Sequence, residues 1–305
     1  ESRGGRALGT TRRGVGPAYV DKVARLGIRV GDLLDKEVLL TRLRSVVDHK
    51  NAILTKIYGA SPLSLDEVYG QCCYYGEHLV PFVRQTDFIV QEAQEKGQLI
   101  LLEGAQGTLL DLDFGTYPYV TSSSPIAGGA CVGLGLGPTK IDRVLGIFKS
   151  YNTRVGSGPM PTELLDETGD LIRERAHEFG TTTGRPRRCG WFDAVAARFS
   201  ARINGFTGIA LTRLDILDTL PSLKICVNYK VNGKTLDHFP SSSVVLGDCE
   251  PVYEEISGWQ TSTGEARHLE DLAPGAQRYL KRLEELIKCP IDLISVGPAR
   301  EQSIM

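Results

Sequence analysis

The sequence lacks a net charge of either sign, and it lacks any long hydrophobic run. Its 305 residues include 35 Lys and Arg against 37 Asp and Glu, so the whole chain has no electrostatic field that would attract a polyanion. No apolar run approaches the roughly 18 residues that a membrane helix needs. We therefore expect no nucleic-acid partner and no membrane partner, and any site for an anion must be local.

Clustered metal ligands are also missing. The seven cysteines are odd in number and scattered, and Cys72 and Cys73 are adjacent rather than spaced as metal ligands. This pattern predicts reduced thiols in a cytoplasmic protein. The five histidines are dispersed, which predicts solvated positions and neither a metal-binding nor a catalytic role; they are His49, His78, His177, His238 and His268.

The start of the chain has no initiator methionine, no signal sequence and no transit helix. It begins at Glu1 with a short glycine-containing segment, and we expect this start to be an internal cut in a longer polypeptide. The length permits either a single α/β unit or two closely packed lobes.

Short apolar runs alternate with helical patterns along most of the chain. Strands are predicted at Gln98–Leu102, Val144–Phe148, Thr207–Leu211 and Ile291–Ser295, and an unalternating apolar run is typical of a central strand covered on both faces. Helices are predicted at Glu167–Glu178, Trp191–Ile203 and Pro274–Lys288. The alternation predicts an α/β fold with a largely parallel central sheet and flanking helices.

Two segments depart from this alternation. Helical spacing of apolar residues after Leu33, and a second helical stretch from Ser64 towards Gly97 with a kink at Pro81, predict a helical excursion over about 33–97. Asn232-Gly233 predicts a type I′ turn in a peripheral β-hairpin. The neighbouring Gly233-Lys234-Thr235 therefore resembles a phosphate loop only superficially.

The segment Gly180–Trp191 carries three arginines, three threonines and flexible glycines before a predicted helix. Guanidinium groups can hold carboxylates and phosphates by bidentate hydrogen bonds, so this segment predicts an anion-gathering loop. The alternative is a solvated basic loop, which is less favoured because no acidic residue interrupts the run.

Two weaker candidates accompany this loop. The glycines of Gly9–Arg25 permit close backbone approach to a phosphate, although a loop near a chain end would explain the same composition. Thr212-Arg213-Leu214-Asp215 follows a predicted strand, where an aspartate can accept hydrogen bonds from the N1–H and amine of guanine. Alternatively Asp215 caps a turn, a role that Asp218 could fill equally well.

Four segments together resemble signatures of the adenylosuccinate synthetase family and occur in the family's order. They are Gly14–Arg25, Glu103–Thr108, Asp113–Ser122 and Thr182–Arg188, and the resemblance covers essentially the whole chain. Val15 replaces a more usual isoleucine, a change that should not affect chemistry. The resemblance implies a P-loop-NTPase-like fold and a single synthetase domain over residues 1–305.

The resemblance also implies an activity, the GTP-dependent ligation of IMP and L-aspartate to adenylosuccinate with release of GDP and phosphate. It implies a homodimer in which Arg25 reaches the partner's IMP. The implied IMP-binding residues are Thr11, Arg25, Gln106, Thr121 and Arg185. The implied aspartate-binding residues are Thr181, Thr182, Thr183, Gly184, Arg185, Pro186 and Arg187. The implied GTP-binding residues are Arg187, Arg213, Leu214, Asp215, Ser295, Val296 and Gly297, with Arg213 where the family often has lysine.

The family's glycine-rich phosphate loop, its catalytic aspartate and its catalytic histidine lie upstream of residue 1, and so do the expected ligands of Mg²⁺. The resemblance thus assigns no catalytic and no metal-binding residue to this chain, and we expect the chain alone to be inactive. Two other classes remain: a non-catalytic purine-nucleotide-binding module, and a nucleic-acid-binding protein, against which the neutral charge counts.

Overall fold

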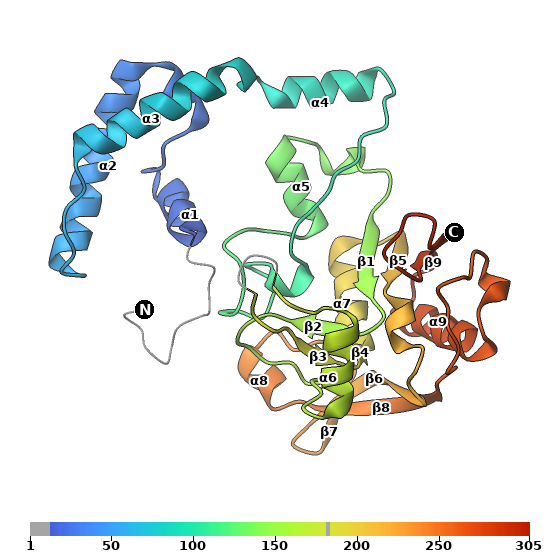
Figure 1. Ribbon diagram of the computed structural model, residues 1–305. Helices are drawn as coiled ribbons and strands as arrows, with labels where there is room; N and C mark the ends of the chain where they lie inside the picture. Colours follow the sequence, from blue (N-terminus) through green and yellow to red (C-terminus); the bar gives the residue numbers. More distant parts are fainter. Residues whose placement is uncertain (1–12, 181–183) are drawn as a thin grey trace. The chain divides into compact units, whose positions relative to one another are not determined.

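The computed structural model describes residues 13–180 and 184–305 (Figure 1). The described residues fall into two compact units, residues 13–101 and residues 102–305, and each is described by itself.

The first unit is built from helices. They are α1 (Val15–Ala24), η2 (Val30–Leu34), α2 (Lys36–Lys56), α3 (Leu65–Leu79), η3 (Val80–Phe82) and α4 (Thr86–Glu95). The long helix α2 begins at Asp35, whose carboxylate accepts hydrogen bonds from two backbone N–H groups of the first turn. Its buried residues Leu39, Leu43 and Val47 recur every four positions, which confirms the amphipathic helix predicted after Leu33.

The predicted kink at Pro81 is a complete break between two helices. α3 begins after Ser64, whose hydroxyl accepts the Glu67 N–H at 3.3 Å, and it ends at Leu79. The short η3 turn containing Pro81 follows, and α4 begins only at Thr86. The proline ring and its missing N–H explain why one helix does not continue through this point.

The strand predicted at Gln98–Leu102 is wrong. This segment has no regular structure, and the side chains of Leu99 and Leu101 are exposed. A strand needs a hydrogen-bonded neighbour, and in the part of the chain that the structure describes this segment pairs with none.

The second unit contains the predicted parallel sheet. Its strands are β1 (Leu145–Lys149), β5 (Gly208–Thr212), β9 (Ile291–Ser295) and β10 (Ser303–Ile304), in the order β1-β5-β9-β10. The first three are parallel, with Leu145 opposite Gly208 and Leu211 opposite Ile294, and β10 is antiparallel to β9. Because β1, β5 and β9 are parallel, their carboxyl ends lie along one edge of the sheet (Figure 1).

The second unit also contains helices and short helical turns. They are η4 (Thr108–Leu110), α5 (Ala127–Leu134), η5 (Pro138–Lys140), α6 (Glu167–Arg175), α7 (Ala194–Asn204), η6 (Leu214–Leu217), α8 (Ser243–Gly247), η7 (Leu269–Asp271) and α9 (Pro274–Ile287). Ile209 and Leu211 of β5 are fully buried in one apolar core with Leu280 and Leu283 of α9. Burial on both faces explains why β5 reads as a continuous apolar run.

A second sheet lies against α7. It is formed by β4 (Phe192–Asp193), β6 (Ser222–Val231), β7 (Lys234–Leu236) and β8 (Glu250–Ser257). β6 and β7 form the predicted hairpin, and Asn232 and Gly233 have the positive φ angles, 51° and 75°, that a type I′ turn requires. The sequence did not predict β8, which makes β6 an inner strand rather than part of an isolated hairpin.

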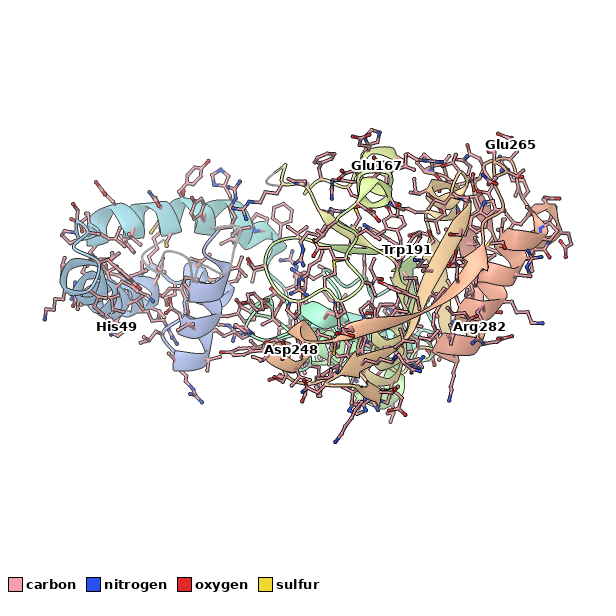
Figure 2. The ribbon with its side chains drawn as sticks, turned by 90° about the horizontal axis from the view of Figure 1, so that it is seen from below. His49, Glu167, Trp191, Asp248, Glu265 and Arg282 are labelled. Atoms are coloured by element: carbon pink, nitrogen blue, oxygen red, sulfur yellow. The ribbon has the colours of Figure 1, made fainter. Side chains whose placement is uncertain are left out.

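The predicted solvent exposure of the histidines is confirmed. All five histidines are exposed, including His49 on α2 (Figure 2). None of the helices that the structure describes is both long and apolar enough to cross a membrane.

Candidate functional site

Two chain segments that carry predicted site residues lie at the carboxyl ends of parallel strands. Arg213 directly follows β5 and Ser295 ends β9, while Lys149, which the sequence did not single out, ends the neighbouring strand β1. Ligands of open α/β sheets bind outside this edge, because the loops that leave neighbouring strands meet there. The sheet therefore brings the predicted GTP-binding residues from two distant parts of the sequence to adjacent positions.

The predicted anion-gathering loop is closed at its base by backbone hydrogen bonds. The N–H of Arg187 donates to the carbonyl of Glu178 at 2.8 Å, and the N–H of Gly180 donates to the carbonyl of Arg185 at 2.8 Å. Phe179 and Pro186 form a bridge between these two bonds. Arg185 is exposed and Arg187 is half-buried, so the base of the loop presents two guanidinium groups. Thr181, Thr182 and Thr183 lie outside the described residues.

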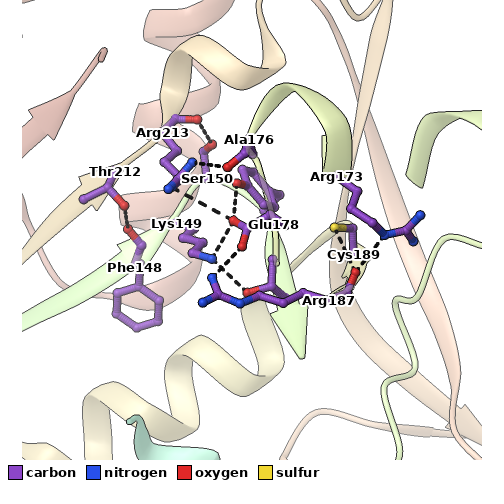
Figure 3. Close-up of polar contacts among 12 residues, drawn as sticks. Phe148, Lys149, Ser150, Arg173, Ala176, Glu178, Arg187, Cys189, Thr212 and Arg213 are labelled. Atoms are coloured by element: carbon purple, nitrogen blue, oxygen red, sulfur yellow. Dashed lines mark hydrogen bonds and ion pairs between the residues drawn. The ribbon is translucent and has the colours of Figure 1, made fainter. Parts of the chain in front are cut away.

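A buried carboxylate lies beneath this loop, and no sequence pattern indicated it. Glu178 is fully buried, and it accepts hydrogen bonds from Lys149 Nζ, the Tyr151 hydroxyl and Arg187 Nη1, each at 2.6 Å (Figure 3). The nearest approach of Arg213 is 4.0 Å, between its Nε and the same carboxylate. One carboxylate thus joins the end of β1, the loop base and the turn after β5.

The protonation of this cluster follows from burial and hydrogen bonding. Burial alone would raise the pKa of Glu178, but the hydrogen bonds from Lys149 and Tyr151 and the nearby positive charges outweigh it and hold the pKa below its usual range. Burial lowers the pKa of Lys149. Burial and the hydrogen bond to Glu178 raise the pKa of the Tyr151 hydroxyl, which therefore remains protonated and donates to the carboxylate.

The turn after β5 contains two aspartates, Asp215 and Asp218, which the sequence alone could not distinguish but which differ in their hydrogen bonds. Asp218 is buried and accepts hydrogen bonds from Trp259 Nε1 at 2.7 Å and from the backbone and hydroxyl of Thr263 at 2.8 and 3.0 Å. Asp215 is half-buried, and no side chain among residues 13–180 and 184–305 donates to its carboxylate. Burial raises the pKa of Asp215, and the nearby charge of Asp218 adds to the rise.

The turn that carries Asp215 is stabilised by hydrogen bonds from side chains of other segments. Arg213 adopts a left-handed backbone conformation with φ of 63°, and its carbonyl accepts the Ser150 hydroxyl at 2.7 Å. The carbonyl of Asp215 accepts Arg175 Nη2 at 3.0 Å. The neighbouring Leu214 is fully buried in the core, so its side chain fixes the turn rather than facing a ligand.

The loop after β9 lies beside this turn, because β9 is paired with β5. The Ser295 hydroxyl donates to the carbonyl of Gly297 at 2.8 Å, and the N–H of Val296 donates to the carbonyl of Gln302. A Cβ at Gly297 would lie 2.2 Å from the end of the Gln302 side chain. A larger residue here would therefore have to displace the Gln302 amide, which accepts the N–H of Ala299 at 3.1 Å.

The glycine-rich segment after Glu103 contains Gln106 and Thr121. Gln106 is exposed with φ of 62°, and the N–H of Thr121 donates to the carbonyl of Leu110 at 2.9 Å. Between them the fully buried Asp111 accepts the Ser124 hydroxyl at 2.6 Å. Burial opposes ionisation of Asp111, but this bond and backbone N–H groups outweigh it and lower its pKa. Asp111 thereby fixes the loop that carries Thr121.

A cation that has no carboxylate partner among residues 13–180 and 184–305 stabilises the same loop. Arg154 on β2 (Asn152–Arg154) donates to the hydroxyl of Thr116 at 2.9 Å and to the carbonyl of Tyr119 at 3.1 Å. Burial and the charge of Arg188 on β3 (Arg188–Gly190) lower the pKa of Arg154 to about 10. Arg188 differs because it pairs with Glu163.

Two more IMP-binding residues were predicted, Thr11 and Arg25. Thr11 lies outside the described residues. Arg25 is exposed in a left-handed conformation at the C-terminus of α1. Within the segment Gly9–Arg25, which was expected to approach a phosphate through a glycine-rich loop, residues Val15–Ala24 form the helix α1, which corrects that expectation for these residues. Pro17 lies in the first turn, where its missing N–H costs no helical hydrogen bond.

No group of three or more His, Cys, Asp or Glu side chains that could hold a metal ion occurs in the described parts of the chain. The described residues therefore offer no protein cage for a metal ion.

A largely parallel sheet with flanking helices, and with arginine and aspartate residues in the segments at the carboxyl ends of its strands, is the arrangement of an α/β enzyme. A model of the adenylosuccinate synthetase family matches residues 1–304. The adenylosuccinate synthetase of Dehalococcoides mccartyi strain 195 is 58% identical over 304 residues, which are 100% of this chain and 72% of that protein. That of Carboxydothermus hydrogenoformans is 55% identical over 305 residues, which are 100% of this chain and 71% of that protein.

A solved structure agrees with the sequence comparisons. The fully ligated adenylosuccinate synthetase from Plasmodium falciparum is 37% identical, with a TM-score of 0.93 over 100% of this chain and 72% of that one. The chain belongs to the adenylosuccinate synthetase family. Members of this family ligate IMP and aspartate with GTP, and they use Mg²⁺.

Proposed function

We propose that the carboxyl edge of the parallel sheet is where this family member holds GTP and L-aspartate during adenylosuccinate synthesis. The observation that carries the proposal is the contrast between Asp215 and Asp218. One aspartate of the turn is fully bonded within the protein, while the other, three residues earlier, has acceptor capacity left for a ligand.

The guanine assignment rests on the chemistry of Asp215. An ionised carboxylate is an acceptor with two oxygens, which matches the adjacent N1–H and amine donors of guanine and does not match adenine. The proposed guanine site is completed by Arg213, by the backbone of Leu214, whose side chain is buried in the core, and by the loop Ser295, Val296 and Gly297, because β5 and β9 are neighbours in the sheet.

The aspartate assignment rests on the loop between Glu178 and Arg187. Aspartate carries two carboxylates, and guanidinium groups bind carboxylates through paired charge-assisted hydrogen bonds. Arg185 and Arg187 are those groups, and Thr181 to Gly184 with Pro186 form the rest of the proposed loop. Arg187 would also contact nucleotide phosphates.

The proposed IMP site uses Thr11, Gln106, Thr121 and Arg185, with Arg25 contributed to the partner's site in a homodimer. In the proposed reaction GTP phosphorylates O6 of IMP, and the amino group of aspartate then displaces phosphate. The residues of this chain bind and orient the three anionic substrates. Mg²⁺ would neutralise phosphate charge, but no step is assigned through it, since the described residues offer it no cage.

Two broader proposals accompany these assignments. Residues 1–305 form a single synthetase domain with the helical stretch over about 33–97 as an excursion; the family match across residues 1–304 supports it. The protein functions in the cytoplasm, which is consistent with its seven free cysteines.

The test is a coupled assay on the full-length protein that contains this sequence, supplied with IMP, L-aspartate, GTP and Mg²⁺. We expect adenylosuccinate to form with GTP and not with ATP. Equal use of ATP, or no adenylosuccinate, would overturn the proposal. The chain as printed, assayed in parallel, tests the expectation that it is inactive alone.

A further inference from the structure

Glu178 lies where three parts of the unit meet. It follows α6, and its Oε1 accepts Lys149 Nζ from the end of β1 and the hydroxyl of Tyr151 just beyond, both at 2.6 Å. Its Oε2 accepts Arg187 Nη1, also at 2.6 Å. The side chain of Glu178 has no exposed surface, and its hydrogen-bond partners among the described residues all donate to it.

Arg187 is therefore fixed by hydrogen bonds at one nitrogen of its guanidinium group, Nη1, and at its backbone. Its N–H donates to the Glu178 carbonyl, and its own carbonyl accepts Arg173 Nε at 2.9 Å. No hydrogen bond from Arg187 Nε or Nη2 reaches any residue in 13–180 or 184–305. Glu178 thus fixes the direction of the guanidinium while donors remain for another ligand.

The segment that leads into Glu178 is braced against the turn that carries Asp215. Arg213 Nη1 donates to the carbonyl of Ala176 at 2.8 Å, and Arg175 Nη2 donates to the carbonyl of Asp215 at 3.0 Å. Arg213 Nε also lies 4.0 Å from Glu178 (Figure 3). The position of the loop base is consequently defined relative to this turn.

We propose that Glu178 is a positioning residue for the ligation reaction, which orients Arg187 towards aspartate and fixes the loop base relative to the guanine turn. The proposal rests on the assignment of Arg187 to aspartate under the proposed function. It assigns Glu178 no contact with substrate. Its role is geometric, because a small displacement of a group that holds a substrate reduces the rate strongly.

The test compares Glu178→Gln with a matched control, Glu254→Gln, in the full-length protein that contains this sequence. The Glu178→Gln change would replace one acceptor oxygen by an NH₂ donor, which faces the other donors of the cluster. Arg187 would lose its charged hydrogen-bond partner and would no longer be held in one orientation. In the control, Glu254 on β8 also binds an arginine, Arg282, at 2.8 Å, but remote from the loop. We expect Glu178→Gln to raise the KM for L-aspartate by about tenfold or more, with less change in the KM for GTP, and Glu254→Gln to change neither.

Two further variants keep the test decisive if Glu178→Gln does not fold. Glu178→Asp retains the charge and should recover part of the affinity for aspartate. Tyr151→Phe removes one hydrogen bond to Glu178 and should raise the KM for aspartate a few-fold, by roughly the value of one such bond.

If Glu178 had a purely structural role, its variants would have a lower melting temperature, but their KM values for L-aspartate and GTP would equal those of Glu254→Gln. That result in the folded variants would overturn the proposal. Failure of the proposed function is distinguishable, since the unmodified protein would then make no adenylosuccinate. An active unmodified protein with unchanged KM values in the variants contradicts only the role of Glu178.

Discussion

The turn after β5 and the base of the arginine loop both place a carboxylate near the carboxyl edge of the sheet, but they satisfy it differently. Glu178 at the loop base is fully buried and accepts three hydrogen bonds from protein side chains. Asp215 in the turn is half-buried, and no described side chain donates to it. The difference separates a residue that holds the protein from a residue that has capacity left to hold a ligand.

The largest expected effect is on stability, at the loop base. Glu178→Gln leaves Lys149 and Arg187 without their carboxylate, and their side chains are only 25% and 26% exposed. We expect a loss of about 3 kcal/mol in the free energy of unfolding, the lower end for breaking a buried ion pair. Urea denaturation measures it, and a loss below about 1 kcal/mol, typical of a surface pair, would contradict the description of this cluster.

The second largest expected effect is on the use of GTP, and it results from a change in the turn after β5. Asp215→Asn exchanges an acceptor-only carboxylate for an amide of almost equal size. Because hydrogen bonds to a charged group are worth about 1.5–3 kcal/mol, we expect the KM for GTP to rise by roughly 10- to 100-fold with little change for IMP. Steady-state kinetics with each substrate varied in turn measures this. An unchanged nucleotide preference would return Asp215 to a turn-capping role.

Asp218→Asn provides the matched comparison within the same turn. This change turns an amide towards the donors of Trp259 and Thr263, so we expect a loss of about 1–3 kcal/mol in stability. The KM for GTP should stay close to that of the unmodified protein. Thermal melting and kinetics on the same preparation check both statements, and a GTP defect without a stability defect would reverse the roles of the two aspartates.

The smallest effect is a pH dependence. The folded pKa of Glu178 lies below its usual value of about 4.3, so its stabilising contribution is complete above that pH and is lost as the pH falls through the folded pKa. The stability difference between the unmodified protein and Glu178→Gln should therefore be constant from pH 8 to about pH 5 and shrink below about pH 4.3. Chemical denaturation at each pH tests this, and a difference that persists undiminished to pH 3 would exclude it.

Local signals in the sequence were sufficient for several elements. Strand β9 occupies the predicted residues Ile291–Ser295, and the Asn232-Gly233 turn has the backbone that its residues favour. In each case the determining residues are adjacent in the chain. The family resemblance was likewise carried by contiguous segments, and it is confirmed by the family match.

Features that depend on distant partners were not predictable. Gln98–Leu102 has the same apolar composition as the buried strands, but pairing decides whether such a run becomes a strand. The partners of Glu178 lie 29, 27 and 9 residues away in the chain, so neither its burial nor its role follows from helical periodicity. The same limit applied to Asp215 and Asp218, whose difference depends on Trp259 and Thr263.

The most direct test is a comparison of KM for GTP and KM for L-aspartate in Asp215→Asn and Glu178→Gln, assayed side by side in the full-length protein that contains this sequence. We predict a crossed result, in which Asp215→Asn impairs chiefly GTP use and Glu178→Gln chiefly aspartate use. Equal effects of both variants on both substrates, or no effect of either, would contradict the division of the sheet edge into a guanine turn and an aspartate loop.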